Sequence, residues 1–187
     1  MKGITKSTVN SGIPIYQKVD ETASGGFTIS ETVLPAGTTI PAGTVMGYDE
    51  TSRLAVPAKF GVLQANALNS DTVYKVLKGS NLAVGMSINL PSGTARAITA
   101  IDTTNANYDS ITVGTTIGQA ANAGIGLFVS DAGYNAGLKG LLWHDHDLAT
   151  GEDCALVVKG TVYANRIAPI PDSIKALIPT IIFSKSY

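Results

Sequence analysis

The densest group of chemically capable side chains is His144-Asp145-His146-Asp147, which holds both histidines of the chain. Side chains alternate between the two faces of an extended strand, so His144 and His146 would share one face and the two aspartates the other. Two imidazoles at this spacing could ligate a metal ion, but a zinc site needs at least a third protein ligand from elsewhere. The pattern favours an exposed polar strand that leads into a turn, and it leaves His144 and His146 as weak candidates for a metal site.

The other reactive side chains indicate no catalytic arrangement. Adjacent carboxylates usually mean solvated surface when they fall in turns, as predicted for Asp20-Glu21, Asp49-Glu50 and Glu152-Asp153. The glycines separate short strands instead of joining a strand to a helix, so they form no phosphate-binding loop. Cys154 lies in an apolar run and is predicted to be a small buried residue. We expect neither enzymatic activity nor a cofactor.

Composition narrows the function classes further. Only 14% of the 187 residues are charged, the net charge is -1 and 44% are hydrophobic. Without a basic patch, nucleic-acid binding is not expected, and the chain is too apolar to be disordered. A single cysteine allows no disulfide framework. We see no signal peptide and no run near the roughly 20 apolar residues of a membrane helix, so we expect a protein made in a cytoplasm that does not bind membranes.

The stretch 141–164 carries the strongest β signal and predicts the position of the core. Leu141–Trp143 is apolar, and turn-forming small and acidic residues fill 149–153. Cys154–Val158 is a short apolar run rich in β-branched residues, which is typical of a buried strand. Gly160 interrupts this run before it resumes, and a glycine within a strand pattern predicts a bulge or a bend.

Short strands separated by turn residues continue along most of the chain. A hairpin is predicted from residues 44–48 and 54–57, with Pro57 at a strand end or edge. Further strands are predicted at 72–77, 82–88, 95–102, 110–113, 127–129 and 180–183. A short helix is predicted over 174–178, capped by Asp172 or Ser173. We therefore expect an all-β fold, a small barrel or sandwich with an inserted β subdomain and one short C-terminal helix.

Residues 1–30 are polar with scattered apolar positions, too apolar for a solvated tail and too irregular for a helix. They form either a frayed terminus or an arm that orders on a partner by adding a strand to an exposed edge. In the second interpretation, the apolar residues of the arm contribute to a partner interface; they are Ile13, Ile15, Val19, Phe27 and Ile29.

A turn motif occurs twice, as Leu34-Pro35-Ala36-Gly37-Thr38 and Ile40-Pro41-Ala42-Gly43-Thr44, and Asp49 follows. This pattern resembles bacteriophage head fiber proteins, a group carried by phages and prophages of Bacteroidetes-type hosts. Later segments are similar to the same group, so the resemblance covers roughly residues 30–187. These segments are Tyr74-Lys75-Val76 with Lys78-Gly79 and Val84-Gly85, then 98–102, 174–179 and 181–184.

A weaker resemblance is to the lambda-type phage head decoration protein, through Asp145–Gly151 and Val157-Val158-Lys159-Gly160. Taken together, the two resemblances divide the chain into an N-terminal arm (1–30), a decoration-like β core (31–57 plus 129–187) and an inserted β subdomain (58–128). They imply a trimeric, β-rich protein bound outside a capsid shell. None of the shared motifs is catalytic.

We therefore expect a non-enzymatic virion structural protein, a head fiber or capsid decoration protein on the capsid exterior. Its partners would be the phage major capsid protein and two further copies of itself in a homotrimer, and it would be synthesised in the cytoplasm of the host bacterium. The alternative is a carbohydrate-binding adhesin module that presents its site on the 58–128 insertion, with a host surface glycan as partner. That site would need exposed aromatic side chains, for which the insertion offers Phe60, Tyr74, Tyr108 and Phe128.

Overall fold

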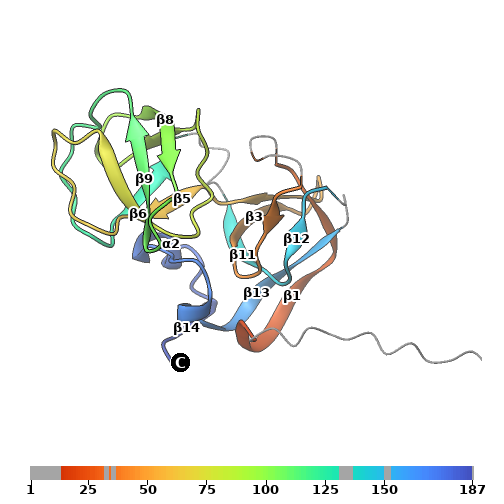
Figure 1. Cartoon of the computed structure of the whole chain (residues 1–187). Coiled ribbons are helices and arrows are strands. Elements are labelled where there is room, and N and C mark those ends of the chain that lie inside the picture. Colours follow the sequence, from red (N-terminus) through yellow and green to blue (C-terminus); the bar gives the residue numbers. More distant parts are fainter. Residues whose placement is uncertain (1–13, 32–33, 35–36, 131–136, 150–152, 187) are drawn as a thin grey trace, which may run out of the picture.

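The computed structural model describes residues 14–31, 34, 37–130, 137–149 and 153–186 (Figure 1). The described chain is nearly all β, as the sequence predicts. Its strands are β1 (Tyr16–Ile29), β2 (Thr39–Ile40), β3 (Val45–Asp49), β4 (Leu54–Pro57), β5 (Phe60–Val62), β6 (Val73–Leu77), β7 (Ser87–Asn89), β8 (Arg96–Asp102), β9 (Tyr108–Val113), β10 (Gly126–Val129), β11 (Leu138–Leu142), β12 (His146–Asp147), β13 (Cys154–Tyr163) and β14 (Ile181–Ser184).

Five strands form a small barrel in the order β1-β4-β3-β11-β13, which closes because β1 also pairs with β13. The predicted hairpin is confirmed: β3 and β4 are antiparallel, and Pro57 is the last residue of β4. The predicted core strand is confirmed as β13, whose Leu156 and Val157 are fully buried. β14 extends the barrel sheet by pairing parallel with the second half of β13.

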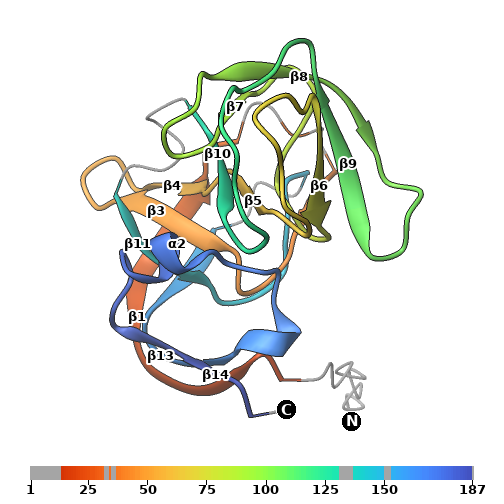
Figure 2. The ribbon, with the colours of Figure 1, turned by 90° about the vertical axis from the view of Figure 1, so that its left-hand side faces the viewer.

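The strands between β4 and β11 build a second sheet, in the order β5-β10-β7-β8-β9-β6 (Figure 2). A bridge between Leu63 and Val76 links its first and last strands beyond the end of β5. This sheet encloses a hydrophobic cluster of its own, with Tyr74, Ile88, Ile111 and Leu127 at its centre. The predicted insertion, 58–128, spans these strands except for Val129; its division from the core as a separate domain stays a prediction.

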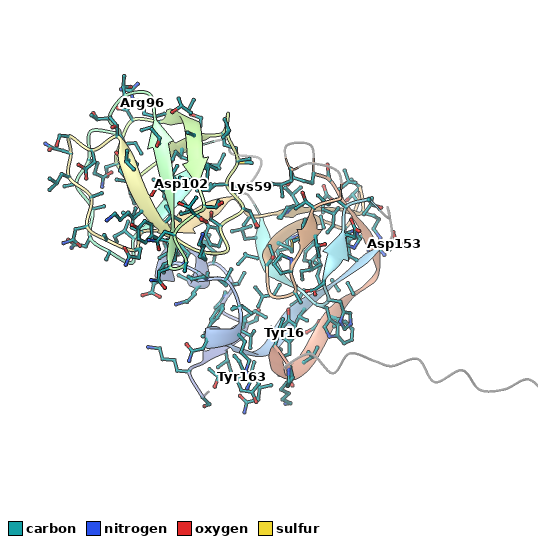
Figure 3. The ribbon with its side chains drawn as sticks, in the orientation of Figure 1. Tyr16, Lys59, Arg96, Asp102, Asp153 and Tyr163 are labelled. Carbon is teal, nitrogen blue, oxygen red and sulfur yellow. The ribbon has the colours of Figure 1, made fainter. Side chains whose placement is uncertain are left out.

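A buried ion pair lies where the chain passes from the barrel to the second sheet. Lys59 follows β4, and its ammonium group donates a hydrogen bond to the carboxylate of Glu31, which follows β1. Both side chains are completely buried, and Figure 3 shows Lys59 between the two sheets. The backbone carbonyl of Lys59 accepts the N–H of Val129 from β10 at 3.1 Å. Lys59 therefore connects Glu31, which follows β1 of the barrel, to β10 of the second sheet.

The interpretation of residues 1–30 as an arm separate from the fold is wrong for residues 16–29. These residues form β1, which pairs with β13 along most of its length and with β4 at its end. Their irregular pattern has a structural cause, because the register between β1 and β13 shifts repeatedly, as between the pairs Val19–Gly160 and Glu21–Lys159. A bulged strand loses strict alternation and so hides its period from the sequence.

The irregularity predicted at Gly160 is confirmed, because the register with β1 shifts between the pairs Val19–Gly160 and Glu21–Lys159, although β13 itself continues. A Cβ at Gly160 would lie 2.5 Å from the Lys18 carbonyl oxygen, so glycine allows β1 to approach closely. Two other local predictions need correction. Of the strand predicted over 82–88, only its last two residues fall in β7. The C-terminal helix is α2 (Asp172–Lys175); it begins earlier than predicted, and its N-cap residue, Pro171, makes no side-chain capping bond. A 3₁₀ turn, η1 (Ala164–Arg166), precedes it.

Candidate interaction surface

The repeated turn motif and the segment that begins at Asp145 contact each other, although they are far apart in sequence. β2 and β12 pair antiparallel, with His146 opposite Ile40. The carboxylate of Asp145 accepts the Ala42 N–H at 2.8 Å. The second copy of the turn motif is thereby fixed against the segment that resembles decoration proteins.

The two histidines lie in different environments. β12 contains only His146 and Asp147, so His144 precedes the strand and the alternation expected from the sequence does not apply to it. His144 is exposed and stacks on Trp143 with ring centroids 4.9 Å apart, whereas His146 is buried. Within the described ranges, no three His, Cys, Asp or Glu side chains gather closely enough to hold a metal ion.

An aromatic and charged cluster surrounds the turn of the β3–β4 hairpin. The ring of Tyr48 packs edge-on against Phe27, with centroids 4.9 Å apart and an interplanar angle of 61°. The Lys139 ammonium lies 4.8 Å from the centroid of Tyr48, and the Arg53 guanidinium lies 4.9 Å from that of Phe27. Because Phe27 is fully buried and Tyr48 is not, the cluster links the core to the surface.

The turn that carries this cluster is held by the side chain of Asp49. The carboxylate of Asp49 accepts the N–H groups of Thr51 at 2.7 Å and Ser52 at 3.3 Å, and these bonds lower its pKa. Arg53 has a φ of 58°, a left-handed conformation that few residues other than glycine adopt. The conformation returns the chain to β4 with the Arg53 guanidinium over Phe27.

Two surface grooves share Tyr48 as a wall. One has a volume of about 370 Å³ and is mainly apolar; its other lining residues are Gly47, Asp49, Ser52, Leu54, Val56 and Gly137. The second, of about 280 Å³, is mainly polar and is lined by Glu21, Thr22, Ala23, Phe27, Glu50, Arg53 and Val158. Burial raises the pKa of Tyr48, and the charges of Glu50 and Glu21 raise it further. We call these two grooves the Tyr48 surface; its polar groove contains the carboxylates of Glu21 and Glu50 and the guanidinium of Arg53.

A second surface surrounds β14, and we define the β14 surface as Lys18, Lys175, Leu177, Ile182 and Lys185. Leu177 and Ile182 are large apolar side chains with 56% and 63% of their surface exposed. Lys18 belongs to the same face, because Thr161 of β13 lies between it and Ile182 in the two ladders. Lys18 pairs with Asp20 at 2.5 Å and Lys175 with Asp172 at 2.8 Å. Lys175 lies 5.7 Å from the ring centroid of Phe183, whose side chain is on the opposite face of β14 from Ile182. The β14 surface therefore has two sides, with Lys18 and Ile182 on one and Lys175 on the other.

The residues predicted for a partner interface mostly contribute to the barrel core. Phe27 is fully buried inside its own chain and is not available to a partner, which corrects that assignment. Ile15, Val19 and Ile29 are partly buried and pack against the core clusters of the barrel. Ile13 lies outside the described residues. The assignment is wrong for Phe27, because it took a buried side chain of a barrel strand for an unpartnered one, and for the other four residues it stays a prediction.

The aromatic residues of the insertion give little support to a sugar-binding platform there. Tyr74 is buried in the core of the second sheet, and Phe60 and Phe128 pack against a barrel cluster. Tyr108 is half-buried, with the Lys75 ammonium 5.1 Å from its ring centroid. Carbohydrate binding on the insertion therefore stays a prediction that depends on Tyr108.

Cys154 is buried, as predicted, and packs in the barrel core. Burial raises the pKa of its thiol to about 11, so the unreactive protonated form is favoured at neutral pH. No described helix is both long and apolar enough to cross a membrane.

Sequence reasoning missed the Tyr48 surface and the buried pair of Lys59 and Glu31. The acidic turn at Asp49-Glu50 was identified, but the sequence does not reveal that Glu21 and Tyr48 lie beside it. A signal for the buried lysine exists, because Lys59 stands between Val56-Pro57-Ala58 and Phe60-Gly61-Val62, where an exposed side chain is not expected. Comparison of the chain with protein-family models, curated proteins and solved structures found no match.

Proposed function

We propose that this chain is a non-enzymatic virion structural protein that binds the outside of a phage capsid as a head fiber or decoration protein, as a homotrimer. The supporting observation is the contact between its two resemblance segments. The head-fiber-like turn motif reaches β2, the decoration-like segment forms β12, and the two strands pair. The two strands form a two-stranded sheet of their own, so both motifs contribute to one structural feature.

The architecture suits binding to the repeated subunits of a capsid shell. A closed barrel leaves few free strand edges, which limits unwanted association. The barrel and the second sheet have separate hydrophobic clusters, so one can contact a shell while the other projects from it. The major capsid protein is the proposed partner. Binding to it requires the burial of protein surface at the interface and no catalytic reaction.

Capsid binding is the direct test. The purified chain is mixed with capsids of the parent phage that lack it and is then sedimented through a sucrose cushion. We expect the chain to pellet with capsids and to saturate at a fixed ratio to the capsid subunit. A chain that stays in the supernatant at all concentrations would contradict the proposal. Melting curves of free and mixed protein provide the control for folding.

A further inference from the structure

The buried pair of Lys59 and Glu31 lies beside a short seam of the barrel. β1 and β4 run parallel along this seam, and two residue pairs join them, of which Ile29–Ala55 is the second. Glu31 and Lys59 follow the ends of these two strands, so the contact between their side chains continues the seam beyond its last ladder pair. A bond at this position would fasten β1, the strand that closes the barrel, to the segment that leads into the second sheet.

The two side chains are an amine and a carboxyl group held in contact inside the protein. Both are completely buried, and Nζ of Lys59 donates a hydrogen bond to Oε2 of Glu31. Only that oxygen stands between Nζ and Cδ, the carbon that the amine would attack. Reacting groups that are held in a well-oriented contact reach effective concentrations of about 10⁵–10⁸ M.

Burial favours the uncharged forms of both groups. Two charges are costly to remove from water, and their attraction offsets that cost only when the geometry is very good. Burial lowers the pKa of the Lys59 amine, although the hydrogen bond and the charge of Glu31 act in the opposite direction. Transfer of one proton from the ammonium to the carboxylate leaves a neutral amine beside a neutral acid. The amine then has the free electron pair that a nucleophile needs.

The other oxygen of Glu31 has a partner that suits this reaction. Oε1 accepts the backbone N–H of Leu34 at 3.1 Å. When the amine attacks Cδ, negative charge develops on Oε1, and a backbone N–H directed at such an oxygen stabilises the tetrahedral intermediate. Oε1 is therefore placed to become the carbonyl oxygen of an amide, and Oε2, next to the protons of the amine, is placed to leave.

We propose that Lys59 and Glu31 condense after folding to form an amide cross-link within the chain. The Nζ–Cδ bond forms and the Cδ–Oε2 bond breaks. Of the three protons of the ammonium, one stays on the amide nitrogen and two leave with Oε2 as water, so the reaction needs no other reactant. The product replaces two buried charges by a neutral amide, and its burial protects it from hydrolysis. The inference goes beyond capsid binding, because both reacting groups belong to one chain.

Mass spectrometry of the intact, denatured chain tests the proposal. Protein that is purified in urea should have the mass calculated from its sequence, and after refolding its mass should fall by one water molecule. Circular dichroism confirms that refolding has occurred. Digestion with trypsin locates the bond, because trypsin cleaves after Arg53 but not after an acylated Lys59. The cross-link should therefore join the peptide 19–53 to the peptide 54–75.

Two variants and an internal control assign the loss of water to this pair. Lys59→Met and Glu31→Ala each remove one reacting group and should keep the full calculated mass. The control within the wild type is the ion pair of Lys78 and Asp109, whose atoms are 2.5 Å apart but whose lysine side chain is 37% exposed. Contact without burial should not give an amide, so the wild type should lose one water molecule and not two. The rate should be independent of protein concentration, because the reaction is intramolecular.

A refolded wild type that keeps its full mass after prolonged incubation would overturn the inference, and so would a loss of water that persists in Lys59→Met. The tryptic map needs only the wild type, so it decides the matter even where a variant does not fold: a free peptide 54–59 in place of the joined peptides contradicts the cross-link. Chain that has not reacted retains the ion pair, and its mass identifies the form whose unfolding is measured.

Discussion

The buried pair of Lys59 and Glu31 allows a prediction whose size follows from the structure. Because neither side chain is exposed, solvent cannot screen a charge left without its ionic partner. Replacing Lys59 by Met keeps an unbranched side chain of similar length but leaves the carboxylate of Glu31 without the ammonium. Removing one member of a buried pair costs about 3–5 kcal/mol. A domain is commonly stable by about 5–15 kcal/mol, so Lys59→Met should remove a large share of the stability.

The double variant Lys59→Met with Glu31→Gln distinguishes charge from packing. Oε1 of Glu31 also accepts the Leu34 N–H at 3.1 Å, and a glutamine oxygen can retain this bond without a negative charge. The double variant should therefore recover most of the stability lost in Lys59→Met. Glu31→Gln alone leaves a buried ammonium and should be destabilised as well. The cycle of four proteins then gives the coupling energy of the pair.

Urea unfolding followed by the fluorescence of Trp143 measures these free energies, because the chain has a single tryptophan, which packs against the barrel core. A cost below about 1 kcal/mol for Lys59→Met would refute the reasoning, since that is the range of exposed ion pairs. A double variant no more stable than Lys59→Met would assign the loss to packing of the lysine stem and would refute the role given to charge. Unchanged m-values across the cycle would show that all four proteins unfold in the same way.

Other predictions follow from the same structure. Deletion of residues 1–30 should abolish cooperative thermal unfolding, because it removes β1 with the fully buried Phe27. Gly140→Ala should lower the free energy of unfolding in urea by about 1–3 kcal/mol or more, because its Cβ would lie 2.5 Å from the Val157 carbonyl oxygen. The pKa of Asp49 is lowered from 3.8 by N–H bonds, so its contribution to stability is present above that value and is lost as the pH falls through the lowered pKa. The difference in melting temperature between the wild type and Asp49→Ala should therefore shrink in acid. Cys154, with a pKa of about 11, should react with a thiol reagent at about pH 8 far more slowly in the native protein than in denaturant.

The fold class and many strands could be predicted because their signals are local. The hairpin of β3 and β4 follows from two short apolar runs around a turn, and β13 follows from a buried run rich in β-branched residues. β1 could not be predicted, because its bulges remove the alternation on which strand prediction depends. Its apolar side chains were visible in the sequence, but their partners on β13 and β4 lie far along the chain.

The candidate surface depends on long-range contacts, which explains why sequence reasoning missed it. The same reasoning placed both Asp49-Glu50 and Asp20-Glu21 in turns, where each would be ordinary solvated surface, but Asp20 and Glu21 lie in β1. Closure of the barrel by β1 brings Glu21 and Phe27 to the hairpin, and a groove then exists between them.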